Sequence, residues 1–147
     1  MEATLYEQDF YAWANEQAGL LRAGKLTAAD IEHIAEEIES MGKAEKRELV
    51  SRLAVLLQHL LKWQFHADRR GKSWRLSVIE RQRQVERHLA DNPSLKARLG
   101  ESMTDAYGDA ILAAARETDL DSENFPADCP WTFEQIMDPA FWPDSSV

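Results

Sequence analysis

Cysteine, glycine and proline are scarce in this sequence, and each scarcity excludes a class of structure. The one cysteine, Cys129, cannot form an intramolecular disulfide or a thiolate zinc site, and a lone thiol is typical of a reducing compartment. Six glycines and five prolines in 147 residues are too few for a sheet protein with many tight turns. The scarcity of these breakers favours long helices.

Long apolar runs are also missing. No run approaches the roughly 18 residues that a membrane span requires. The first ten residues carry Glu2, Glu7 and Asp9, where a signal peptide would have a basic region followed by an apolar one. We therefore expect a cytoplasmic protein with no membrane segment. Hydrophobic residues make up 44% and charged residues 29% of the chain, which is typical of one globular domain, and we expect a single domain over residues 1–147.

Charge is distributed unevenly along the chain. The net charge is −9, which weighs against general affinity for nucleic acid or anionic membranes. Between Lys62 and Arg87, however, there are eight basic and three acidic residues, a net charge of +5. The remaining sequence carries 9 basic and 23 acidic residues, a net charge of −14. We therefore expect a strongly dipolar molecule.

Apolar residues recur at helical spacing in five segments, and these predict an all-α bundle of about five helices. The predicted helices cover residues 4–24, 27–41, 44–66, 73–91 and 95–117. The third has the clearest apolar stripe, through Leu53, Leu56 and Leu60, and should be the buried centre. In the second, the residues expected to face inward are Ile31, Ile34, Ala35, Ile38 and Met41, and Gly42 should end or kink the helix.

The last thirty residues follow a different pattern. Residues 118–147 hold four of the five prolines and five large aromatic side chains. We expect this segment to be irregular, with one short helix at residues 132–137. Because a disordered tail would have little use for so many aromatic residues, we expect it to pack on the helices of residues 1–117.

Several short strings, in this order and spacing, resemble the bacterial family known as domain of unknown function 29. They are Leu5–Trp13, Glu36–Gly42, His59–Trp63, Ser73–Trp74, Asn92–Leu95 and Cys129–Trp131. The resemblance covers nearly the whole chain, from about Leu5 to Phe141. It implies a helical bacterial protein. It carries over no biochemical activity and no catalytic residues.

Histidines and carboxylates on the second and third predicted helices raise the possibility of a metal site. His33 with Glu36 or Glu37 has the spacing that places two ligands on one helix face. A di-metal bundle needs that motif twice, and it occurs once. His59 and His66 lie seven residues apart, about 10 Å along a helix, which is too far to share an ion. We therefore expect no bound metal or other cofactor, and regard these glutamates as a solvated face.

Covalent catalysis has no support in the sequence. Cys129 lies between Asp128 and Pro130, with no neighbouring base to lower its pKa. No serine lies in a G-x-S-x-G pattern, and the scattered glycines form no phosphate-binding loop. These absences favour a protein that is not an enzyme.

The basic stretch is the strongest candidate site, and three interpretations of it remain open. It could be a solvated face, a protein contact, or a nucleic-acid surface with Trp63 and Trp74 as stacking platforms. The expected contact residues are Arg69, Arg70, Lys72, Arg75, Arg83 and Arg87. Because the rest of the chain is acidic, we favour a protein-interaction module that binds a partner or itself, as a homo-oligomer. The alternatives are a metal protein or enzyme using His33, Glu36 and Glu37, and, less favoured, nucleic-acid binding through residues 69–87.

Overall fold

The computed structural model describes residues 4–143, and in that range the chain forms six α-helices, four short 3-10 segments and no strand. The predicted all-α fold class is confirmed. The contacts divide the chain into an N-terminal unit, Met1–Ala44, and a C-terminal unit, Glu45–Val147, which are described in turn. The expectation of a single domain stays a prediction. Residues 1–3 and 144–147 lie outside the described range. They belong to the first ten residues, where we expect no signal peptide, and to the C-terminal segment expected to pack on the helices.

The N-terminal unit begins with two helices where the sequence predicted one. Helix α1 (Leu5–Gln8) stops at Asp9, and α2 (Phe10–Arg22) starts directly after it. The Asp9 carboxylate accepts a hydrogen bond from the backbone N–H of Ala12 at 3.0 Å and thereby caps α2. Because the short aspartate side chain bonds to a backbone N–H that the following helix leaves unpaired, it favours ending α1 and starting a second helix over one continuous helix. A 3-10 turn, η1 (Leu26–Ala28), leads into α3.

Helix α3 (Ile31–Phe65) is continuous, and the prediction of two helices separated at Gly42 is wrong. A glycine inside a helix costs only about 1 kcal/mol relative to alanine, so favourable neighbours on both sides can carry a helix through it. The predicted inward stripe is also wrong: Ile31, Ile38 and Met41 are exposed. The spacing of these residues indicated a helix correctly, but no described element covers them.

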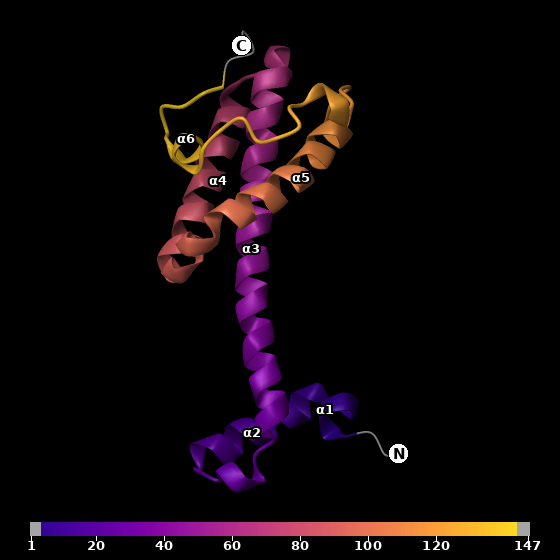
Figure 1. Ribbon diagram of the computed structural model, residues 1–147, viewed down its shortest axis with the longest axis vertical. Coiled ribbons are helices and arrows are strands. Elements are labelled where there is room, and N and C mark those ends of the chain that lie inside the picture. Colours follow the sequence, from indigo (N-terminus) through magenta and orange to yellow (C-terminus); the bar gives the residue numbers. More distant parts are fainter. Residues whose placement is uncertain (1–3, 144–147) are drawn as a thin grey trace. The chain divides into compact units, whose positions relative to one another are not determined.

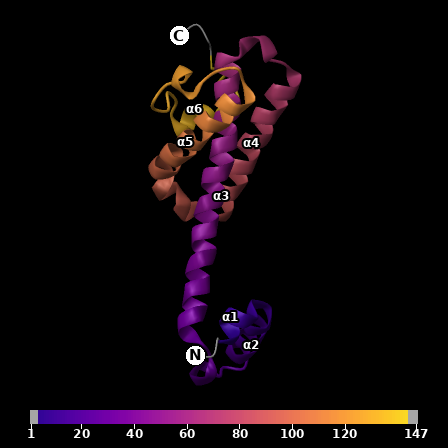
Figure 2. The same cartoon turned by 90° about the vertical axis from the view of Figure 1, so that its right-hand side faces the viewer.

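The C-terminal unit contains the second part of α3 and the elements that follow it (Figure 1). They are η2 (Ala67–Arg69), α4 (Lys72–Asp91), η3 (Pro93–Arg98), α5 (Leu99–Glu117), η4 (Ser122–Asn124) and α6 (Phe133–Met137). Helix α4 runs beside α3, and α5 crosses it (Figure 2). Two predicted starts move: Gly71, not Ser73, is the N-cap of α4, and residues 93–98 form a 3-10 segment, so that α5 begins at Leu99.

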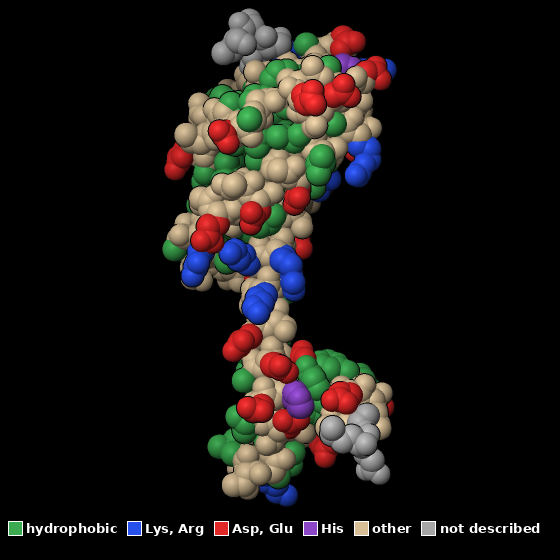
Figure 3. Space-filling model, turned by 45° about the vertical axis from the view of Figure 1, so that its right-hand side comes forward, with side chains coloured by type: hydrophobic (Ala, Val, Ile, Leu, Met, Phe, Trp, Pro, Cys, Tyr) green, Lys and Arg blue, Asp and Glu red, His purple; other side chains and the backbone are tan. Residues whose placement is uncertain are grey.

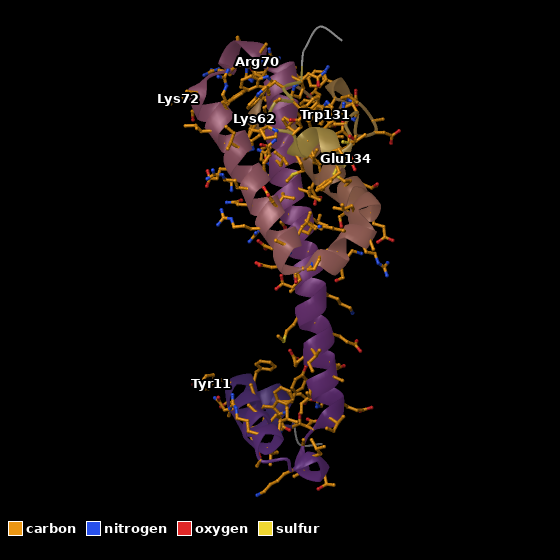
Figure 4. All side chains as sticks on the ribbon, turned by 90° about the vertical axis from the view of Figure 1, so that its left-hand side faces the viewer. Tyr11, Lys62, Arg70, Lys72, Trp131 and Glu134 are labelled. Carbon is orange, nitrogen blue, oxygen red and sulfur yellow. The ribbon has the colours of Figure 1, made fainter. Side chains whose placement is uncertain are left out.

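The core of this unit is built around the leucine stripe of α3. Leu53, Leu56 and Leu60 are fully buried, as predicted. The buried cluster also includes Trp131 and Ile136, from the segment after α5 (Figure 4). The helix predicted at residues 132–137 is confirmed as α6, capped by Thr132.

Candidate interaction surfaces

Five of the six predicted contact residues lie on the surface of α4 or just before it. They are Arg69, Lys72, Arg75, Arg83 and Arg87, and all five are exposed. Arg69 belongs to η2, and the other four are carried by α4. Figure 4 shows Lys72 at the end of the unit where α4 begins. The structure therefore places these five cations where a partner could reach them.

Arg70 differs from the other five by its hydrogen bond to the backbone of α3, whereas its contact with the Trp63 ring is shared by Arg75. The Nε of Arg70 donates a hydrogen bond to the carbonyl oxygen of Trp63 at 2.6 Å, and its guanidinium lies 5.3 Å from the centroid of the Trp63 ring. Arg70 thus satisfies a carbonyl in the last turn of α3 and is half-buried. Arg70 is therefore engaged within the unit, because the unpaired carbonyls at the end of a long helix need donors.

The spacing along α4 brings basic and apolar side chains onto one line. At about 3.6 residues per turn, positions 72, 76, 83 and 87 point in nearly the same direction. We call Lys72, Leu76, Arg83 and Arg87 the α4 ridge. Leu76 is 53% exposed, so the ridge offers an apolar contact between cations. Two exposed acidic residues, Glu80 and Glu86, flank this line.

A groove beside the α4 ridge contains cations that the sequence did not single out. It encloses about 540 Å³ between α3 and α4, and Arg52, Arg81 and Arg87 line it together with Glu48 and Asp91. Arg52 pairs with Glu48 at 2.8 Å and donates to the carbonyl of Gln84 at 3.0 Å. Arg52 was missed because it lies outside the basic stretch in the sequence and joins it only through the packing of the two helices.

In the N-terminal unit, polar contacts converge on Asp30. Its carboxylate accepts a hydrogen bond from Trp13 Nε1 at 3.1 Å and lies 2.6 Å from Nδ1 of His33. Its backbone N–H donates to the side chain of Gln17 at 2.7 Å. The bond to His33 lowers the pKa of Asp30, and the same bond raises the pKa of His33. Asp30 therefore joins α2 to the start of α3.

An aromatic cluster packs beside this network. The Tyr6 ring stacks on His33 with centroids 4.0 Å apart and meets Trp13 edge-on at 4.8 Å. The Tyr6 hydroxyl donates a hydrogen bond to Glu37, which raises the pKa of Tyr6 to about 12. The segment Leu5–Trp13, one of the strings that resemble the family, therefore packs α1 and α2 against the first turns of α3.

Two of the three candidate metal ligands, His33 and Glu37, are engaged in other contacts. His33 is paired with Asp30, Glu37 accepts from Tyr6, and Glu36 is exposed. In residues 4–143 no three histidine, cysteine or acidic side chains converge as a set of metal ligands. His59 lies apart, with Nδ1 2.7 Å from the carbonyl of Val55, and burial lowers its pKa. His66 lies 3.5 Å from Asp68.

Exposed apolar side chains concentrate in the N-terminal unit. Ten large hydrophobic side chains are exposed between residues 4 and 143, and eight of them precede residue 45. They are Leu5, Phe10, Tyr11, Leu21, Leu26, Ile31, Ile38 and Met41. Of the described residues of this unit, 4–44, Trp13 is the buried apolar side chain. The N-terminal unit therefore exposes more large apolar side chains than the C-terminal unit does, and where such side chains are contiguous they are typical of interaction surfaces.

Acidic residues lie next to part of this apolar surface. On α3, Glu32, Glu36 and Glu39 border a shallow hollow of about 280 Å³. Figure 3 shows acidic side chains gathered over the N-terminal unit, with hydrophobic ones beside them. The first 44 residues carry nine acidic and three basic residues. This surface is therefore both apolar and negatively charged.

A second hollow lies where α4 begins. It encloses about 490 Å³ and includes Lys62, Arg69, Trp74 and Glu117. Lys62 Nζ is 2.8 Å from Glu117 and 5.0 Å from the centroid of the Trp74 ring. Its charge is therefore already paired within the unit.

Comparison with known proteins gives one family. The model of the family "Domain of unknown function DUF29" matches residues 5–142. The chain belongs to this family. No curated protein and no solved structure matches this DUF29 chain.

The family match spans both units of this DUF29 protein. It begins with α1 and ends at Trp142, so it includes the aromatic cluster, the α4 ridge and the segment after α5. The surfaces described above therefore all lie within the family domain.

No helix within residues 4–143 combines the length and apolar character of a membrane span.

Proposed function

We propose that this DUF29 protein is a non-enzymatic interaction module that binds a second copy of itself, with its N-terminal unit as part of the contact. The observation that supports this most directly is the concentration of exposed apolar side chains before residue 45. Leaving so many large apolar groups in water is unfavourable by about 25 cal/mol per Å² of exposed surface. A partner that covers them recovers that free energy.

Two exposed isoleucines offer the clearest test. Ile31 is 54% exposed and Ile38 is 63% exposed, and they lie seven residues apart on one side of α3. Replacing both with serine removes apolar surface from the proposed contact and leaves the buried Trp13 untouched. Since covering one such side chain contributes on the order of 1.5 kcal/mol, we expect the dissociation constant to rise about tenfold or more.

Sedimentation velocity over a range of protein concentrations measures this change. The matched control is Leu112→Ser, which removes a side chain that is 60% exposed on α5. The control should leave association unchanged. Equal sedimentation of wild type, the double variant and the control would contradict the proposal.

The setting we propose for this module is the bacterial cytoplasm. Burial raises the pKa of the half-buried Cys129 thiol and so favours its protonated, unreactive form. A lone unreactive thiol is compatible with a reducing compartment. Cell fractionation of the native host tests this location.

The rival function is a metal protein that uses His33, Glu36 and Glu37. It has less support because Asp30 and Tyr6 already engage two of these three side chains. Elemental analysis of the dialysed protein separates the two hypotheses. One equivalent of zinc, iron or manganese per chain, lost in the His33→Ala variant, would favour the rival.

A further inference from the structure

We propose that the self-association is heterologous: the acidic face of α3 in the N-terminal unit of one molecule docks on the α4 ridge of a second copy. This inference rests on the proposed function and specifies the two surfaces that meet. It is supported by the complementary charge of these surfaces and by the exposed apolar side chains that each carries.

The first surface combines carboxylates with an apolar edge. Positions 32, 36 and 39 of α3 point in similar directions, and positions 31 and 38 lie on the adjacent side of the helix. The opposite side of this segment faces α1 and α2, where His33 and Glu37 make their contacts with Asp30 and Tyr6. Glu32, Glu36 and Glu39 are exposed, so the face is open to a partner.

The second surface has the opposite charge and a similar form. Lys72, Arg83 and Arg87 are exposed along one line of α4, with Leu76 between them. The line from residue 72 to residue 87 spans about 22 Å, and residues 31–41 of α3 span about 15 Å, so the ridge is long enough to receive the whole acidic face. Glu80 and the exposed Glu86 flank the ridge on its two sides and reduce the charge of its three cations to a net +1, so that it stays basic.

Charge decides between this contact and a symmetric one. In a symmetric pairing of two N-terminal units, the exposed carboxylates Glu32, Glu36 and Glu39 of each copy would approach a second unit whose sequence is also net acidic, and the two would repel each other. Against the α4 ridge, the same carboxylates meet cations. Opposite charges across an interface raise the association rate and fix the relative orientation of the partners, whereas like charges oppose the pairing.

A charge exchange between the two surfaces tests the inference. The first variant is Glu32→Lys/Glu36→Lys/Glu39→Lys, and the second is Lys72→Glu/Arg83→Glu/Arg87→Glu. Each alone should raise the apparent dissociation constant at least about tenfold, because like charges now face each other. An equimolar mixture should regain association, since either contact that joins the two variants pairs opposite charges. Sedimentation velocity at about 0.15 M salt measures all three samples, and circular dichroism verifies that each variant is folded.

The control reverses three other exposed cations, in the variant Arg47→Glu/Lys96→Glu/Arg116→Glu. It changes the net charge as much as the second variant does and leaves the α4 ridge intact, so we expect it to associate like wild type. If a triple variant does not fold, the single changes Glu36→Lys and Arg83→Glu replace the triples. Each single variant alone should then associate more weakly than wild type, and an equimolar mixture of the two should regain association. Both changes should be smaller than for the triple variants.

The outcomes separate this inference from the proposed function. Loss of association in each variant and recovery in the mixture support the heterologous contact. If the wild type associates but the mixture associates no more strongly than either variant alone, the heterologous contact is overturned and self-association is still supported. A wild type that stays monomeric at every concentration overturns both.

Discussion

Asp30 shows how one side chain can organise the N-terminal unit. It contacts Trp13 and His33 through its carboxylate and Gln17 through its backbone, so residues on α2 and α3 depend on it. The helix predicted over residues 27–41 placed Asp30 near a helix start. The role of Asp30 as the partner of His33 could not be predicted, because Glu36 and Glu37 have equally suitable spacing.

The ion pair of Asp30 and His33 predicts a specific pH dependence. The pKa of His33 is raised above its ordinary 6.5, and that of Asp30 is lowered below its ordinary 3.8. The pair therefore stabilises the fold fully between these two values. Its contribution is lost as pH rises through the folded pKa of His33 or falls through the folded pKa of Asp30.

NMR titration of the histidine ring protons measures the shift. We expect the His33 midpoint to lie above 6.5 and the midpoint of the half-buried His59 to lie below it. Asp30→Asn should lower the His33 midpoint, and Glu32→Gln should lower it less, since Glu32 acts only through longer-range attraction. A His33 midpoint that Asp30→Asn leaves unchanged would exclude the pair as the cause.

At the scale of elements, the sequence predicted where the helices lie better than it predicted which of their apolar faces are buried. The leucines of α3 were assigned correctly to the core, because a long apolar stripe flanked by polar residues is most stable when other helices cover it. The stripe of Ile31, Ile38 and Met41 has the same period, yet it is exposed. Periodicity reveals that a face is apolar, and only tertiary packing or association determines what covers it.

The leucine stripe supports a prediction about stability. Leu56 is fully buried, so Leu56→Ala leaves a cavity and should reduce the free energy of unfolding by about 2–5 kcal/mol. Urea denaturation followed by circular dichroism measures the change. Leu112→Ala, at an exposed position of α5, should have little effect, and an equal loss in both variants would contradict the assigned core.

Two glycines should respond to alanine with opposite signs. Gly42 lies inside α3, and a methyl group added there would meet no other side chain or element within 4 Å, so Gly42→Ala should stabilise the protein by about 0.5–1 kcal/mol. Gly24 has a φ of 72°, where a side chain costs roughly 1–2 kcal/mol, so Gly24→Ala should destabilise it. The same denaturation experiment compares them. Destabilisation by Gly42→Ala would contradict a continuous α3.

For the whole molecule, the uneven charge seen in the sequence becomes two surfaces of opposite sign. The basic stretch was recognised from composition alone, and five of its six expected contact residues are exposed. The acidic partner surface could not be located, because acidic residues are spread over most of the chain. Only the structure shows that those on the first turns of α3 lie beside exposed isoleucines.

Salt should weaken the association of this molecule. Attraction between the surfaces extends over about 10 Å at 0.1 M salt and about 3 Å at 1 M. We expect a larger dissociation constant at the higher salt concentration.

Arg70 is left unchanged in all contact variants because its bond to Trp63 is structural.

The most direct test of self-association is sedimentation equilibrium of the wild-type chain at several protein concentrations in about 0.1 M and about 1 M salt. We predict an average mass that rises with protein concentration above the 16.8 kDa of one chain, and rises less at high salt. A mass that stays at 16.8 kDa under all these conditions would contradict the account.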